Sequence, residues 1–256
     1  QRRTQTAEDW AMGGRSLPTY VLVFTQFATL VGGGVLVGHV SIGFSYGLAP
    51  LTYGICGAAG CFIMAIIAAW LRENEFTTVP DILEKVYGKN KFLMLVGALM
   101  AMVVPFGWIA SQASAFAKLY TEMTGIDINV LIIGMIVVSV LLTIPSGFKA
   151  VAWTDTVCAL VIILGVWVIA IQFLFRVGGV GAMNEGIAAV NPEFVQGFSV
   201  TIPPRTALSW VITWGICNFG APQFVARFMS AESPEVAAKS QGITGIGLLA
   251  FYVPLV

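Results

Sequence analysis

An apolar run with three consecutive glycines at its centre decides the fold of this chain: Phe27-Ala28-Thr29-Leu30-Val31-Gly32-Gly33-Gly34-Val35-Leu36-Val37-Gly38. A helix in lipid must satisfy its own backbone hydrogen bonds, and glycine is the poorest helix former after proline. Three glycines in mid-span therefore favour a helix that is interrupted so that its backbone groups line a binding site. The spacing of Gly34 and Gly38 also fits close helix packing through small residues, so both interpretations stay open at this point.

The composition is that of an integral membrane protein. Of the 256 residues, 57% are hydrophobic and 10% are charged, whereas about a quarter of the residues in soluble domains are charged. The net charge is zero, which gives no electrostatic basis for binding nucleic acid. The chain begins with Gln1 and ends inside the apolar run 247–256, so we expect it to be a piece of a longer chain.

Apolar runs predict six complete membrane spans and the start of a seventh, given that a span needs about 20 apolar residues. The six predicted spans cover residues 17–41, 47–71, 92–119, 128–144, 151–175 and 206–228, and the seventh begins near Gly242. We take residues 1–16 as a cytoplasmic leading segment and residues 17–256 as one truncated membrane domain. The loop 72–91, with Pro80 ahead of Asp81, predicts a short amphipathic helix.

The lysines and arginines predict the orientation of these spans, because they collect in cytoplasmic loops. With the N-terminus inside, ten of the thirteen fall on the cytoplasmic side. The three that remain outside are Lys118, Arg176 and Arg205. We therefore expect a multi-pass protein of a bacterial inner membrane with a cytoplasmic N-terminus.

The sixth span is interrupted like the first, with Gly215, Gly220 and Pro222 in its middle. The two interrupted spans are five spans apart and cross the membrane in opposite directions. Two inverted five-helix repeats would each begin with such a helix and would place the binding site between them. This favours the binding-site interpretation of the glycine run over the packing interpretation.

Four ordered motifs, at residues 8–18, 77–88, 150–157 and 219–229, resemble motifs of the sodium/solute symporter family. Residues 28–34 are most similar to its choline-transporter branch, and Trp214 with residues 219–229 to its proline transporters. The resemblance implies an all-α, LeuT-like membrane fold with a five-plus-five inverted repeat, of which this chain holds core helices one to seven. It also implies transport of a small organic solute coupled to inward sodium movement.

By this resemblance, the backbone carbonyls of Ala28 and Val31 are sodium ligands, and their hydroxyl partners lie on core helix eight, beyond this sequence. Sodium is then a transported ion and not a prosthetic group. Asp155 is placed near the inner exit route for sodium. An acid inside a span is functional by default, but Asp155 also lies where the fifth predicted span begins, where an acid compensates the helix dipole.

Mid-span aromatic and polar residues are the candidate solute ligands. Trp108 and Trp214 lie away from the interfaces where tryptophan collects, and they could stack on a proline ring or hold a quaternary ammonium; plain core packing is the alternative. Ser111 lies on the same helix face as Trp108. The full candidate set is Gly32, Gly33, Trp108, Ser111, Gln112, Trp214 and Asn218.

Two further ionisable residues have ordinary explanations. The only histidine, His39, lies near the outer end of the first span and is expected to be a hydrogen-bonded interface residue rather than a proton relay. Arg227, near the inner end of the sixth span, is expected to snorkel or to pair with a cytoplasmic carboxylate.

We therefore expect a sodium-coupled symporter that imports an amino acid such as proline, or a quaternary amine, by alternating access. No hydrolase or P-loop motif occurs, so we do not expect an enzyme. The alternatives are a solute-sensing membrane module fused to a kinase, and an inert fragment if the natural chain ends at Val256. The expected partners are the solute and the lipid bilayer, and the sequence does not indicate an oligomeric state.

Overall fold

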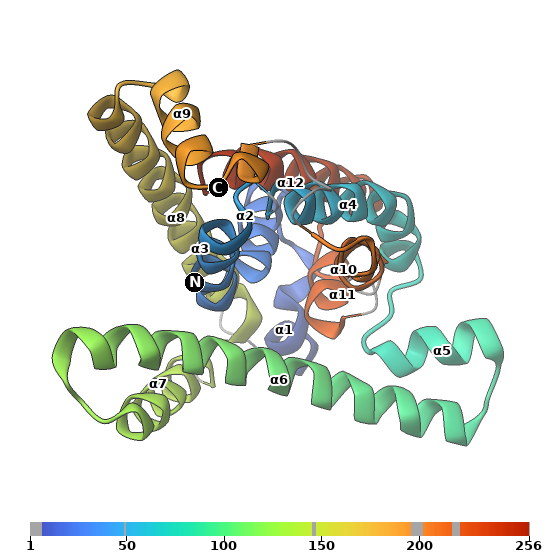
Figure 1. Cartoon of the computed structure of the whole chain (residues 1–256). Coiled ribbons are helices and arrows are strands. Elements are labelled where there is room, and N and C mark those ends of the chain that lie inside the picture. Colours follow the sequence, from blue (N-terminus) through green and yellow to red (C-terminus); the bar gives the residue numbers. More distant parts are fainter. Residues whose placement is uncertain (1–6, 49, 145–146, 196–201, 217–220, 256) are drawn as a thin grey trace.

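The structure is a computed structural model, and it describes residues 7–48, 50–144, 147–195, 202–216 and 221–255. These residues are almost entirely helical and pack as a bundle with two long outlying helices, α6 and α8 (Figure 1). The α-helices are α1 (Ala7–Met12), α2 (Thr19–Leu30), α3 (Gly33–Tyr46), α4 (Pro50–Glu73), α5 (Val79–Tyr87), α6 (Lys91–Thr124), α7 (Ile128–Thr143), α8 (Gly147–Val177), α9 (Val180–Val190), α10 (Pro204–Trp210), α11 (Pro222–Met229) and α12 (Pro234–Leu255). A π-helix, Val211–Ile216, continues α10.

Helix lengths agree with most of the predicted spans. Four single helices of the described residues, α4, α6, α8 and α12, are long and apolar enough to cross a membrane, and α2 with α3 forms a bent fifth. The predicted fourth span is the shorter α7, which has 16 residues. The amphipathic helix expected after residue 72 is α5, where the Asp81 carboxylate accepts the Thr78 N–H at 2.7 Å and so caps the first turn.

The core lies around α2, which is buried over most of its length. α12 packs along both α4 and α2, and α8 covers another side of α2. Small residues permit these close contacts: Gly54 of α4 lies directly against the ring of Tyr252 on α12. α2 is thus enclosed by protein, as a helix that supplies backbone ligands must be.

The seventh span begins eight residues earlier than predicted, at Pro234 instead of near Gly242. The added turns contain a buried polar group: Ser240 accepts a hydrogen bond from Gln26 of α2 at 3.5 Å, and Thr244, just inside the predicted span, donates to the same Gln26 at 3.1 Å. The seventh span was predicted from its apolar residues, so the prediction left out the polar residues before Gly242. It therefore missed turns whose polar groups are satisfied by a neighbouring helix.

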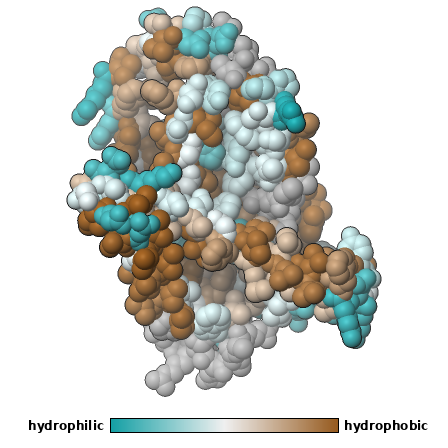
Figure 2. Space-filling model, turned by 60° about the horizontal axis from the view of Figure 1, so that its bottom comes forward, coloured by the Kyte–Doolittle hydropathy of each residue, from teal (hydrophilic) through white to brown (hydrophobic). Residues whose placement is uncertain are grey.

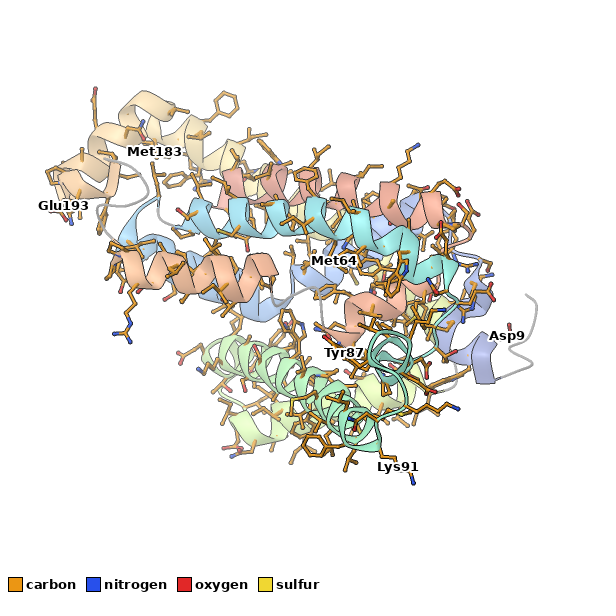
Figure 3. The ribbon with its side chains drawn as sticks, turned by 90° about the vertical axis from the view of Figure 1, so that its right-hand side faces the viewer. Asp9, Met64, Tyr87, Lys91, Met183 and Glu193 are labelled. Carbon is orange, nitrogen blue, oxygen red and sulfur yellow. The ribbon has the colours of Figure 1, made fainter. Side chains whose placement is uncertain are left out.

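The outer helices expose apolar side chains, as lipid-facing surfaces do. Phe106 of α6 is 74% exposed and Phe175 of α8 is 83% exposed. Brown, apolar side chains spread over much of the face in Figure 2, whereas hydrophilic side chains gather toward its edges. Figure 3 places Glu193 and Met183 at one end of the bundle and Asp9 at the other, as expected for loops on opposite membrane sides.

One end of the bundle is closed by contacts of the leading segment. The backbone of Leu17 donates to Ser230 and accepts from Glu232, both at 3.1 Å, just after α11. Arg72 at the end of α4 donates to the Ala231 carbonyl at 2.7 Å, and Arg15 donates to the Glu75 carbonyl at 2.8 Å. The start of the first span and the end of the sixth are therefore joined at this end.

Replacing Gly54 by Ala should lower the thermal stability of the purified complete polypeptide. The added Cβ would overlap the ring of Tyr252, so α4 and α12 must separate, at a cost of about 1–3 kcal/mol. Gly43→Ala is the matched control, because its Cβ would meet only Pro50 at an ordinary 3.9 Å. Equal melting temperatures for the two variants would contradict close packing at Gly54.

Candidate functional site

The first span is broken at Val31 and Gly32. α2 ends at Leu30, α3 begins at Gly33, and the two axes differ by 57°. Val31 has φ −106° and ψ 68°, and Gly32 has φ −86° and ψ 175°, so neither residue is helical. The glycine run therefore marks a broken helix, as the sequence predicted.

The break frees backbone carbonyls at the end of α2. In a continuous helix Val35 would donate to the Val31 carbonyl, but its N–H binds the Gly32 carbonyl at 3.0 Å. Among the described residues, the Gly32 N–H makes no bond that would continue α2 to the Ala28 carbonyl. Both oxygens lie at the negative end of the α2 dipole, so the site favours a small cation with oxygen ligands.

Two polar residues of α6 contact the break. The Gly34 N–H donates to Oε1 of Gln112 at 3.0 Å. A Cβ on Gly32 would lie 2.5 Å from that oxygen, and a Cβ on Gly34 would lie 2.7 Å from Oγ of Ser111. A Cβ on Gly38 would meet nothing within 4 Å. The Gly34 and Gly38 pair therefore does not form the small-residue packing face that the alternative required.

An aromatic stack lies beside this polar contact. The rings of Trp108 and Trp214 are parallel within 3°, with centroids 6.4 Å apart. Trp214 also stacks on Tyr53 of α4 at 4.9 Å, and its Nε1 lies directly against Gly57. The two predicted tryptophans, from α6 and from the π-helix, are thus brought together. π-helical turns occur frequently at functional sites.

His39 is hydrogen-bonded, as predicted, but it is buried between helices and not exposed at an interface. It is 6% exposed, its Nδ1 lies 2.7 Å from the Val35 carbonyl, and its ring packs 4.4 Å from the Tyr53 ring. The prediction failed because α3 starts a new direction at Gly33 and turns this face of the helix toward α4 and Tyr252. Sequence reasoning missed Tyr53 and Tyr252, since single aromatics in apolar spans carry no distinguishing signal.

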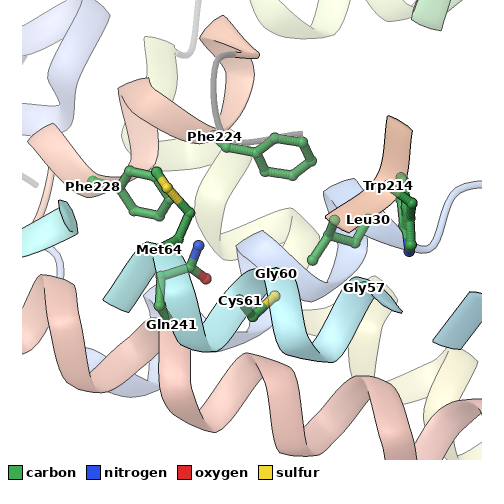
Figure 4. A pocket seen from close by; sticks show the side chains of 9 residues that line it. All are labelled: Leu30, Gly57, Gly60, Cys61, Met64, Trp214, Phe224, Phe228 and Gln241. Carbon is green, nitrogen blue, oxygen red and sulfur yellow. The ribbon is translucent and has the colours of Figure 1, made fainter. Parts of the chain in front are cut away.

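A small cavity of about 10 Å³, room for about one water molecule, lies beside this stack. Figure 4 shows Trp214 and Leu30 at one end and Met64 and Phe228 at the other. Its lining is mainly apolar, and the Oε1 of Gln241 on α12 is buried there without a hydrogen-bond partner among the described residues. The cavity therefore runs from the aromatic stack toward the end of the bundle that Arg72 and Leu17 close.

Asp155 belongs to a buried ion pair rather than to a helix start. α8 begins at Gly147, about one turn earlier than predicted, and Asp155 lies about two turns inside the helix, so the dipole explanation for Asp155 is wrong. Its Oδ2 accepts from Oγ1 of Thr25 at 2.6 Å and from Nη2 of Arg227 at 3.0 Å. Arg227 is 8% exposed and also donates from Nε to Oγ1 of Thr25 at 3.1 Å, so it pairs inside the bundle and does not snorkel.

The structure thus brings together most of the predicted site. One contact joins the glycines Gly32 and Gly33 at the break to Ser111 and Gln112. The stack next to it is formed by Trp108 and Trp214. Ala28 and Val31 lie at the break itself, and Thr25, which holds Asp155, lies one turn before Ala28. Asn218 lies outside the described residues. The roles of these residues as ligands remain predictions.

The comparisons with known proteins identify the family of the chain. A family model described as "Sodium:solute symporter family" matches residues 10–256. The chain belongs to the sodium:solute symporter family. It is 28% identical to the sodium/proline symporter of Escherichia coli (strain K12), covering 91% of this chain and 47% of that protein. It is 24% identical to the human high affinity choline transporter 1, covering 98% and 44%.

A solved structure of a sodium-coupled sialic acid symporter, titled as a substrate-bound outward-open state with a novel Na⁺ site, shares the fold with a TM-score of 0.81. The match covers 99% of this chain and 55% of that chain at 22% identity. The chain is therefore an integral membrane protein with the LeuT-like inverted-repeat fold, and its relatives are transporters, not enzymes. It spans about half the length of the curated relatives it matches.

Removing the Asp155 carboxylate should destabilise the protein because it leaves the Arg227 guanidinium buried without its counter-charge. We expect Asp155→Ala to cost about 3 kcal/mol, and Asp155→Ala with Arg227→Met to recover part of that loss. The measurement is thermal unfolding in detergent. Lys89→Ala is the control, since the Lys89–Glu84 pair is exposed and should contribute under about 1 kcal/mol. A double variant no more stable than Asp155→Ala would contradict this account.

Proposed function

We propose that the complete protein is a symporter that couples inward sodium movement to import of a small organic solute by alternating access. The observation that carries the proposal is the broken first span, which leaves the Ala28 and Val31 carbonyls free next to the Trp108–Trp214 stack. Family membership supports it, and relatives named for proline and choline indicate the solute classes to test. None of these relatives is described as a signalling protein, so the sensing alternative gains no support.

The proposed transport path follows from the packing of the two broken spans. The solute binds against Trp108 and Trp214, with Gly32, Gly33, Ser111, Gln112 and Asn218 as the further predicted contacts. Sodium binds the freed carbonyls and completes its ligand set with hydroxyls from a helix beyond this sequence. With the N-terminus cytoplasmic, in a bacterial inner membrane, the cavity between Trp214 and Phe228 leads inward, and Asp155 lies beside the sodium exit.

The aromatic stack suits either candidate solute. A flat pyrrolidine ring packs against an indole face, and a quaternary ammonium is attracted to the same face by the ring quadrupole. Neither solute needs a charged protein partner at this position. Proline and choline therefore have to be separated by measurement.

The complete polypeptide in proteoliposomes should accumulate its solute only under an inward sodium gradient. Labelled proline and labelled choline are tested in parallel, each with sodium replaced by potassium as the control. Accumulation depends on sodium because the carbonyl site must be filled before the inner side opens. Equal uptake in potassium would contradict the sodium coupling, and uptake of neither compound would redirect the search to other small solutes.

Trp214→Ala should raise the half-saturating solute concentration about tenfold, which corresponds to about 1.4 kcal/mol of lost ring contact. Trp214→Phe, which keeps an aromatic face, should raise it less. Trp167→Ala on the lipid-facing side of α8 is the control and should leave the transport curve unchanged. Transport rates are compared at equal protein abundance, and an unchanged curve for Trp214→Ala would remove Trp214 from the solute site.

A further inference from the structure

The glycines at the break are not required by backbone conformation. Gly32 has φ −86° and ψ 175°, a region that any residue adopts, and none of Gly32, Gly33 and Gly34 has a positive φ. An alanine at Gly32 would therefore cost little if only its own dihedrals mattered. Another constraint must exclude side chains here.

That constraint is the side chain of Gln112 on α6. A Cβ on Gly32 would lie 2.5 Å from Oε1 of Gln112 and 2.6 Å from its Cδ and Nε2. The same Cβ on Gly33 would keep an ordinary 3.6 Å from Oε1. The carboxamide group of Gln112 thus occupies the space next to Gly32.

The carboxamide replaces the cap that α3 lacks. The first N–H groups of a helix have no partner within it, and the side chain of the N-cap residue commonly accepts one of them. Gly32 is the N-cap of α3 and has no side chain, so the Gly34 N–H donates instead to Gln112 at 3.0 Å. α3 is therefore capped by a residue from another helix, about 78 positions away in the chain.

The Gln112 cap lies between the proposed solute site at Trp108 and the proposed sodium site at Ala28 and Val31. Gln112 is one helical turn beyond Trp108 on the same face of α6, and Trp108 stacks on Trp214. On its other side, Gln112 binds the first turn of α3 at Gly34, three residues after Val31. Any displacement of α6 by a solute at Trp108 therefore acts on the carbonyls of the break.

We propose that Gln112 is the positioning residue that couples solute binding to sodium binding, by capping α3 and so setting the direction of the Ala28 and Val31 carbonyls. This inference rests on the proposed function. Coupling between two sites is reciprocal, so solute bound at Trp108 tightens sodium binding and sodium tightens solute binding by the same factor. Without the cap, each ligand binds with an affinity that no longer depends on the other.

The first experiment measures sodium binding to the purified complete polypeptide, from the thermal shift that sodium produces with and without the transported solute. In the wild type, saturating solute should lower the half-saturating sodium concentration. Gln112→Ala should weaken sodium binding about fivefold, as expected for the loss of one capping bond, and should bring the ratio with and without solute close to one. A purely structural role would change the melting temperature without changing this ratio.

The second experiment is a double-mutant cycle with three backgrounds. Gly32→Ala should lower the melting temperature and weaken sodium binding in the wild type, because its Cβ displaces the carboxamide. In the Gln112→Ala background, Gly32→Ala should not lower the melting temperature further, because the space next to position 32 is open. In the Gln112→Leu background it should lower the melting temperature as much as in the wild type, because the leucine fills that space. Gly38→Ala on α3 is the control without a steric effect.

The inference is overturned if Gly32→Ala costs the same in Gln112→Ala as in the wild type, or if Gln112→Ala keeps the wild-type solute effect on sodium binding. These results differ from a failure of the proposed function, in which the wild type itself shows no sodium-dependent binding or uptake. In that case the proposed coupling through Gln112 is also wrong. The melting temperatures of the double-mutant cycle still show whether Gln112 occupies the space next to Gly32.

Discussion

Backbone hydrogen bonding in an apolar medium is the constraint on which the rest of this structure depends. A break in a membrane helix exposes donors on one side and acceptors on the other, and lipid satisfies neither. Here the donor at Gly34 is satisfied by Gln112, while the acceptors at Ala28 and Val31 stay free. Free carbonyls at the negative end of the α2 dipole suit a cation, and such a site needs no charged side chain.

The surroundings of α2 follow from this constraint. A helix that offers backbone ligands cannot face lipid, so α8, α11 and α12 pack around it, and buried polar groups such as Gln26 find partners on α12. One turn before Ala28, Thr25 joins the Arg227–Asp155 pair, which ties α2 to α8 and α11. Arg227 therefore links the first and sixth predicted spans at the ion pair, and the Trp108–Trp214 stack links α6 to the sixth.

Sequence reasoning succeeded where the signal is local. Glycines in an apolar run predicted the broken first span, and apolar runs predicted the main helices. It failed where a distant contact decides the outcome. Ser240 belongs to α12 because its partner Gln26 lies on α2, Asp155 is paired because α11 brings Arg227 beside it, and His39 is buried because α3 changes direction at the break. None of these partners is near in sequence.

Apolar composition, helix breakers and short motifs are local features, so they identify a membrane protein with a broken first span and a resemblance to sodium/solute symporters without any structure. The form of the break depends on tertiary contacts. The carboxamide of Gln112, about 80 residues later, fills the space beside Gly32 and caps α3, so a side chain at position 32 would have to displace that carboxamide. Steric exclusion and hydrogen bonding between helices depend on how the helices pack, and no local pattern specifies that packing.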